Sequence, residues 1–209
     1  MPPIPELEAI RKAQIIDAGM RTIAERGCAN VTMDDVCRAA GMSKGGLAHY
    51  YRSKNELFKS VFQEFFERIF QRGRDTMGQL EDPLDRILSF DWLYDLENPD
   101  MGIGYPLLFD FMAIAVHDDD YREIFHGWID GWVALLREAL REGLDRGLFT
   151  DLDPESTART ISAIYQGIAT RWFLDPACHT TPWAVASFRK AIMGLLGPHI
   201  TAMHPPENR

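Results

Sequence analysis

Cysteine is scarce in this 209-residue chain. Cys28, Cys37 and Cys178 form no C-x-x-C motif and no even framework, which argues against a disulfide scaffold or a structural zinc site. Such cysteine usage fits a reducing compartment, so we expect a cytoplasmic protein.

Long apolar runs are also missing. The longest, residues 103–116, is interrupted by Pro106 and Asp110 and is shorter than the roughly 20 residues that a membrane-spanning helix needs. With 46% hydrophobic and 25% charged residues, the composition is that of a soluble globular protein, and we expect no membrane partner.

An excess of positive charge is absent as well. The chain has 22 Lys and Arg against 31 Asp and Glu, a net charge of −9. Residues 1–56 carry 8 basic and 7 acidic side chains, whereas residues 57–209 carry 14 and 24. The excess of acidic over basic side chains therefore lies in the C-terminal three quarters of the chain. The N-terminal region, which has no such excess, is free to approach a polyanion.

Common catalytic motifs are lacking too. There is no H-E-x-x-H and no Walker A sequence, and Gly102-Ile-Gly104 lacks a third glycine. The run His117–Asp120 with His126 suggests a metal, but three aspartates at a helix junction are more typical of a solvated cap. We expect no catalytic residue, metal or cofactor; an enzyme and a helical adaptor protein remain the alternatives.

What the chain does have is helical apolar spacing. Ile161, Ile164, Ile168 and Trp172 step by three or four residues, and no long stretch alternates with period 2. Breaks are expected at Gly27, near residues 82–83, 98–99, 118–120 and 153–154, and over residues 175–182. The spacing predicts an all-α fold of about nine helices.

Two short helices over residues 32–51 have the dimensions of a helix-turn-helix. Thr32 and Ser43 are predicted to cap them, and Gly41 supplies the positive φ of the turn. The expected packing residues between the two helices are Val36, Ala39, Met42 and Leu47. A further capping box, Ser53 to Glu56, begins a long helix that extends to about Gln79.

Residues 9–69 resemble the N-terminal domain of the TetR/AcrR family of bacterial transcriptional regulators. The resemblance rests on Val31–Val36, on Ala39–Leu47 and on His49–Phe58. It implies an N-terminal three-helix helix-turn-helix domain and a larger helical domain over residues 70–209 that binds ligand and dimerises. It also implies a homodimer whose recognition helices enter successive major grooves of double-stranded operator DNA.

The resemblance also implies which residues contact DNA. Thr32 would contact phosphate, Lys44 and the glycines would lie nearest the bases, and Lys54 would reach phosphate. The chain departs from the family at Ala48, where an aromatic residue is usual, so the operator of common members is not assumed. The expected contacts are Thr32, Ser43, Lys44, Gly45, Gly46, Ala48, His49, Tyr50, Tyr51 and Lys54. Tyr50 and Tyr51 are alternatively core aromatics.

Aromatic residues are abundant beyond the helix-turn-helix and are predicted to line a cavity for a sizeable apolar or aromatic molecule. The alternative is plain core packing. The set is Trp92, Tyr105, Phe109, Met112, Trp128, Trp132, Tyr165 and Trp172. Four aspartates could face a cationic ligand or lie in solvent: Asp91, Asp95, Asp110 and Asp130.

Two stretches rich in Ala, Ile, Leu and Gly, residues 156–174 and 182–196, are predicted to form the homodimer interface. Alternatively they close the core of one chain. Together these features predict a ligand-responsive repressor that binds an inverted-repeat operator and is released by a small-molecule effector.

Overall fold

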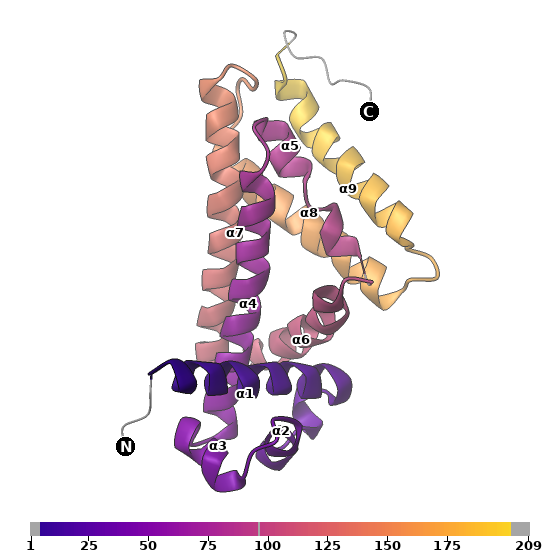
Figure 1. Ribbon diagram of the computed structural model, residues 1–209. Helices are drawn as coiled ribbons and strands as arrows, with labels where there is room; N and C mark the ends of the chain where they lie inside the picture. The colour runs from indigo at the N-terminus through magenta and orange to yellow at the C-terminus, as the bar shows by residue number, and fades with distance from the viewer. Residues whose placement is uncertain (1–4, 96, 202–209) are drawn as a thin grey trace. The chain divides into compact units, whose positions relative to one another are not determined.

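The computed structural model describes residues 5–95 and 97–201, and its regular elements are all helical (Figure 1). The expected all-α fold with nine α-helices is confirmed for this part of the chain. In order, the elements are α1 (Pro5–Arg26), η1 (Cys28–Asn30), α2 (Met33–Ala39), α3 (Lys44–Tyr50), α4 (Lys54–Gly78), α5 (Pro83–Leu88), η2 (Asp91–Tyr94), α6 (Pro99–Ala115), α7 (Asp119–Asp145), α8 (Pro154–Leu174), α9 (Thr181–Leu196) and η3 (Gly197–His199).

Helix starts coincide with side chains that accept hydrogen bonds from the first free backbone N–H groups. Asp82 accepts from Leu84 N and Asp85 N before Pro83 opens α5, and Asp153 caps α8 in the same way before Pro154. An N-terminal proline fits because its missing N–H would have no helical partner at that position. These caps confirm the helix boundaries expected there.

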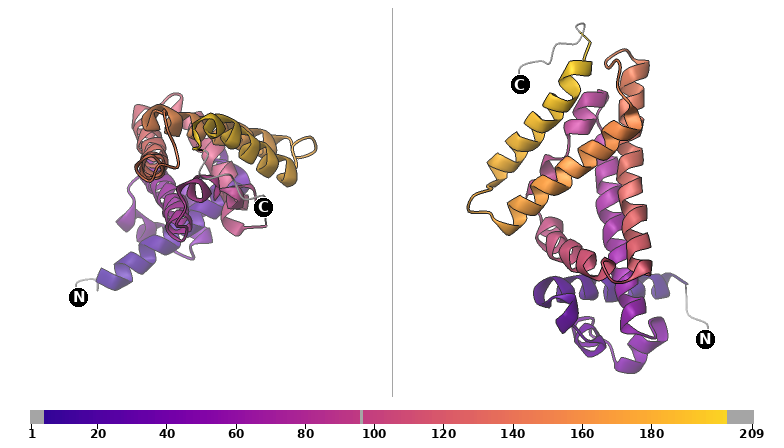
Figure 2. Two further views of the ribbon diagram at one scale, coloured as in Figure 1. Left: turned by 90° about the horizontal axis from the view of Figure 1, so that it is seen from above. Right: turned by 180° about the vertical axis from the view of Figure 1, so that it is seen from behind.

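One compact unit contains residues 5–69 together with Pro99–Phe125. Helix α1 packs against α2 and α6, and α2 and α3 lie on the same side of α1 in Figures 1 and 2. Phe62, Phe66 and Phe111 meet edge to face in its core. Residues 99–125, which the family resemblance assigns to the C-terminal domain, therefore belong to the same unit as the helix-turn-helix and contact α1 through α6.

The second compact unit consists of residues 70–98 and 126–201. Helices α8 and α9 pack against each other and against η2 (Figure 1). Trp172 Nε1 donates to Thr181 Oγ1 at 3.1 Å, and that hydroxyl donates to the Tyr94 carbonyl at 3.1 Å. Gly73 lets α4 approach α7, since a Cβ there would lie 2.3 Å from Trp132.

Across residues 5–95 and 97–201, no helix combines the length and the apolar character needed to cross a membrane.

Candidate functional site

The turn between α2 and α3 has the geometry of a helix-turn-helix. Gly41 adopts φ +64°, which confirms the predicted left-handed turn residue. Val36 and Leu47 are buried between the helices, and Met42 is half-buried. The expectation for Ala39 was wrong: it is exposed, and Cys37 is buried on this helix instead.

Both short helices begin at the caps expected from the sequence. Asp35 N donates to Thr32 Oγ1, and Thr32 N donates back to Asp35 Oδ2 at 2.9 Å, which completes a capping box. Ser43 Oγ accepts from Gly46 N at 3.1 Å. Hydrogen bonds from Thr32 and from Arg26 hold the pKa of Asp35 well below its usual range.

The start of α3 presents an exposed surface. Ser43, Lys44 and Gly45 are exposed, as are Ala48 and His49 further along the helix. A Cβ on Gly45 would meet open space, so the bare backbone there is accessible. Lys44 pairs with Asp34 of α2, and the pKa of Lys44 is raised by this hydrogen bond. Because the pair is exposed, it contributes little to stability.

Three other expected DNA contacts are less accessible. Tyr50 is half-buried with its ring edge against His49, the ring centroids 5.2 Å apart. Tyr51 is 6% exposed, and burial raises the pKa of its hydroxyl. Lys54 Nζ donates to the Cys28 carbonyl at 2.9 Å and lies 5.0 Å from the Phe58 ring centroid. The Lys54 ammonium is thus engaged within its own unit.

Residues 41–45 also have the G-x-S-x-G spacing of a hydrolase nucleophile elbow. That motif requires a strand before the serine, whereas here Ser43 follows α2 and its hydroxyl caps α3. Within the described residues, no group of three or more His, Cys, Asp and Glu is arranged to hold a metal ion. The geometry of Ser43 is therefore that of a helix cap.

The second unit has an aromatic cavity between η2 and helices α7, α8 and α9. Of the eight expected ligand residues, Trp128, Trp132 and Tyr165 line it. The other lining residues are Phe90, Leu93, Ile129, Leu136, Ile161, Ser162, Gln166 and Phe188. Its volume is about 20 Å³, which is room for a single water molecule. The cavity therefore has no room for an organic ligand in this conformation.

The remaining expected ligand residues lie elsewhere. Trp172 is buried against Tyr94, with ring centroids 5.7 Å apart, and Trp92 lies under the Arg72 guanidinium at 4.8 Å. Three others belong to α6 in the first compact unit: Tyr105, Phe109 and Met112. The predicted aromatic set is thus divided between the two units.

Sequence reasoning missed a group of unsatisfied polar atoms on η2. Asp91 Oδ1, Trp92 Nε1 and Tyr94 Oη are buried and have no hydrogen-bond partner among the residues that the structure describes. Tyr94 contacts Tyr165 and Phe188, which line the aromatic cavity, and burial strongly raises the pKa of its hydroxyl. Since an unpaired buried polar group is unfavourable, a polar ligand atom would be stabilised beside η2.

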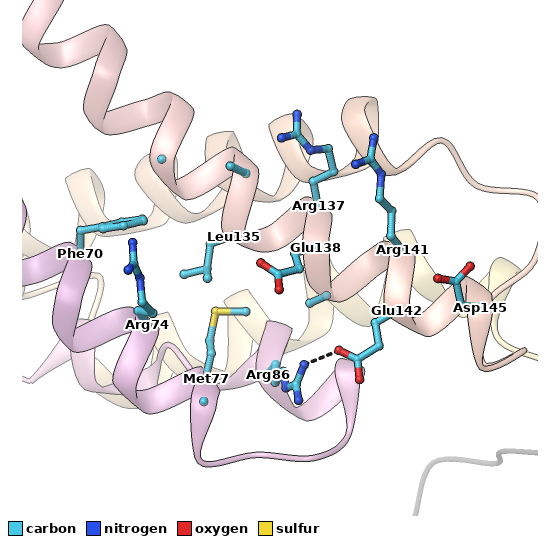
Figure 3. Close-up of a pocket in the computed structure, with 14 residues that line it drawn as sticks. Phe70, Arg74, Met77, Arg86, Leu135, Arg137, Glu138, Arg141, Glu142 and Asp145 are labelled. Atoms are coloured by element: carbon cyan, nitrogen blue, oxygen red, sulfur yellow. Dashed lines mark hydrogen bonds and ion pairs between the residues drawn. The ribbon is translucent and has the colours of Figure 1, made fainter.

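A second cavity, of about 860 Å³, is an open groove between α4, α5 and α7 (Figure 3). Met77 and Leu135 line its apolar part, and Arg86 of α5 bonds Glu142 of α7 at one end. No sequence motif predicted this groove, because charged residues at helical spacing are also typical of a solvent-exposed helix surface. The groove and the aromatic cavity use different faces of α7.

Two models of known protein families match this chain. Residues 15–61 match the family model described as bacterial regulatory proteins, tetR family. Residues 105–197 match the model described as BetI-type transcriptional repressor, C-terminal. The two matches cover the helix-turn-helix and most of the C-terminal region.

Two relatives that align with most of the chain are named as HTH-type transcriptional regulators. The transcriptional repressor KstR2 of Mycobacterium tuberculosis is 30% identical over 172 residues, covering 78% of this chain and 81% of the relative. The regulator PksA of Bacillus subtilis is 27% identical over 168 residues, covering 79% and 80%.

Solved structures share the fold. A TetR-family regulator from Cytophaga hutchinsonii aligns with a TM-score of 0.81 at 16% identity, covering 91% of this chain and 94% of the other. A regulator from Saccharomonospora viridis in complex with choline aligns with a TM-score of 0.79 at 17% identity, covering 88% and 96%. The helix-turn-helix, both family matches and the relatives agree: this chain belongs to the TetR family of DNA-binding transcriptional regulators, a non-enzymatic family.

Proposed function

We propose that this chain is a ligand-responsive repressor, which binds an inverted-repeat operator as a homodimer and is released by a small apolar or aromatic effector. The observation that carries the proposal is the exposed start of α3, where Lys44, Gly45 and Ala48 are accessible. Side chains there would read bases in the major groove, while Thr32 and Tyr50 would contact phosphate.

The surface of α8 supports dimerisation. Ile164 and Ile168 are half-buried in the single chain, and Leu174 is 64% exposed. A Cβ on Gly167 would meet only the Arg171 side chain, at 3.8 Å, and one on Gly194 of α9 would meet open space. A second copy can therefore approach these helices closely and form an isologous four-helix interface.

The small volume of the aromatic cavity supports an effector that selects a second conformation. A ligand larger than water has to displace Trp128, Trp132 or Tyr165, so it favours a state in which these rings have moved. The S. viridis regulator with choline indicates that this fold accommodates a small organic molecule. If the second state reads DNA less well, the effector and the operator weaken each other's binding by the same factor.

The test starts from DNA flanking the gene, labelled for fluorescence anisotropy, with a scrambled duplex as control. Specific binding that weakens steeply with salt is expected, and equal binding to both duplexes would contradict operator recognition. Light scattering is expected to give twice the chain mass; a monomer at micromolar concentration would contradict the dimer.

Effectors are then sought with a panel of aromatic and alkyl-ammonium compounds scored by thermal stabilisation. A hit is titrated with and without operator, using tryptophan fluorescence from Trp128 and Trp132. A weaker dissociation constant in the presence of operator is expected. Equal constants for a compound that loses binding in Tyr165→Ala would show that the cavity does not control DNA binding.

A further inference from the structure

The connection from α1 to the helix-turn-helix is a turn held by a distant side chain. Gly27 ends α1 at φ +76°, a conformation that favours glycine, and η1 follows it. The Cys28 N–H donates to Asp110 Oδ2 at 2.6 Å, and Asp110 lies on α6, 82 residues further along the chain. A carboxylate acceptor makes this hydrogen bond stronger than a neutral one.

The carbonyl of the same residue is held by a group of opposite charge. Lys54 Nζ, from the first residue of α4, donates to the Cys28 carbonyl at 2.9 Å. Cys28 is 7% exposed, and burial together with the nearby Asp110 charge raises the pKa of its thiol to about 12. One residue is thus fixed from both sides in a place with little water, where such bonds are strengthened.

This turn determines where α2 begins. Val31, which is fully buried, and Thr32, the cap of α2, follow η1 directly. Arg26, just before the turn, pairs with Asp35 of the same cap at 2.8 Å. Because α3 packs on α2, a displacement of Cys28 would move both helices of the DNA-reading motif.

We propose that Asp110 is a positioning residue for operator binding, which acts from α6 by fixing the turn at Gly27–Asn30 and through it the orientation of α2 and α3. The inference rests on the DNA-reading role proposed above for α3. Asp110 follows Phe109, one of the expected ligand contacts, on the same helix. Any shift of α6 would therefore also shift the Cys28 contact.

The test compares Asp110→Ala with Asp130→Ala. Each removes one negative charge, and Asp130 is exposed on α7, so the control measures the general effect of charge on DNA affinity. We expect Asp110→Ala to bind operator at least tenfold more weakly than Asp130→Ala. Its salt dependence is expected to match that of the wild type, since no phosphate contact is lost.

Asp110→Asn provides the conservative variant, because its amide oxygen can still accept from Cys28 N–H; we expect about a threefold loss. Alkylation of Cys28, followed by peptide mass spectrometry in a Cys178→Ser background, reports whether the turn has opened in folded protein. Faster alkylation with unchanged operator affinity would overturn the proposal. If Asp110→Ala does not fold, Asp110→Asn is compared with Asp130→Ala, and faster Cys28 alkylation in Asp110→Asn with equal operator affinity overturns the proposal. Failure of wild-type protein to bind operator would instead refute the DNA-reading role.

Discussion

Two tyrosines show how the two compact units differ. In the unit with the helix-turn-helix, Tyr121 is 2% exposed and its hydroxyl donates to Asn55 Oδ1 at 2.9 Å. In the other unit, Tyr94 is fully buried and its hydroxyl has no partner within residues 5–95 and 97–201. Buried polar groups are normally satisfied, so the first unit holds one arrangement while the second has polar groups left to pair.

The same contrast extends to the other contacts. The first compact unit, which contains the helix-turn-helix and is called the DNA-reading unit below, is held by helix caps and by charged side chains that hydrogen-bond backbone atoms. Examples are Asp110 and Lys54, which bond the N–H and the carbonyl of Cys28. The second unit surrounds an almost filled cavity with the ring of Phe90 and with rings from α7, α8 and α9. Under the proposed function, a fixed geometry suits reading DNA, and rings that move apart would admit an effector. The following experiments test this difference, beginning with the largest expected effect.

Removing a large ring from the second unit should cost far more stability than removing a cap from the first. Trp172 is 2% exposed and contacts Tyr94, so Trp172→Ala is expected to lower the free energy of unfolding by about 3–5 kcal/mol. Ser43→Ala removes one cap hydrogen bond and is expected to cost about 0.5–2 kcal/mol. Urea titration followed by circular dichroism measures both. Equal losses would show that the Trp172 ring contributes no more to stability than one helix cap.

Two lysines of the DNA-reading unit should have different effects on operator binding. Lys44 is exposed, so Lys44→Ala is expected to weaken binding about tenfold and to reduce the salt slope by roughly one unit. Lys54 holds the Cys28 carbonyl, so Lys54→Ala is expected to weaken binding without changing the slope. Anisotropy over a salt series distinguishes them. A reduced salt slope for Lys54→Ala would instead support the phosphate contact that the family resemblance implies.

The Asp35 cap should make stability depend on acid pH. Its folded-state pKa lies below its usual value, so the unfolded chain takes up a proton first as the pH falls. The stabilisation is therefore complete above about pH 4, the ordinary aspartate value, and is lost progressively below it. Thermal unfolding of the wild type and of Asp35→Asn between pH 2.5 and 7 should show a difference in Tm that shrinks below pH 4. A constant difference would show that the Asp35 charge contributes nothing.

Features set by neighbouring residues could be predicted from the sequence. The Thr32–Asp35 box, the Ser43 cap and the positive φ of Gly41 all depend on residues within four positions of one another. The helix count and most boundaries follow from spacing and from Asp-Pro pairs. Asp130-Gly131, a dipeptide typical of hairpins, lies inside α7, where helical apolar spacing overrides it.

Long-range pairing could not be predicted. Nothing near Asp110 in the sequence indicates that its carboxylate meets Cys28, and it was expected to face a cationic ligand or solvent. The aromatic residues were expected to form one set because composition shows abundance but not which helix faces which. Lys54 was expected to contact phosphate because the family resemblance implies it. Its hydrogen bond to the Cys28 carbonyl, 26 residues away, depends instead on how α4 packs against the turn at Gly27–Asn30.

The smallest expected effects are those of removing the hydroxyls of Tyr94 and Tyr121, which should change the free energy of unfolding in opposite directions. Tyr94→Phe removes a buried hydroxyl that has no partner in the described part of the chain, so we expect the free energy of unfolding to rise by about 1 kcal/mol. Tyr121→Phe leaves Asn55 Oδ1 without its donor and is expected to lower it by about 1 kcal/mol. Both substitutions keep the ring and its packing, so each serves as the control for the other. Urea unfolding at pH 7 measures the two values. A loss in both variants would mean that the Tyr94 hydroxyl is satisfied in solution, and that the second unit is as fully paired as the first.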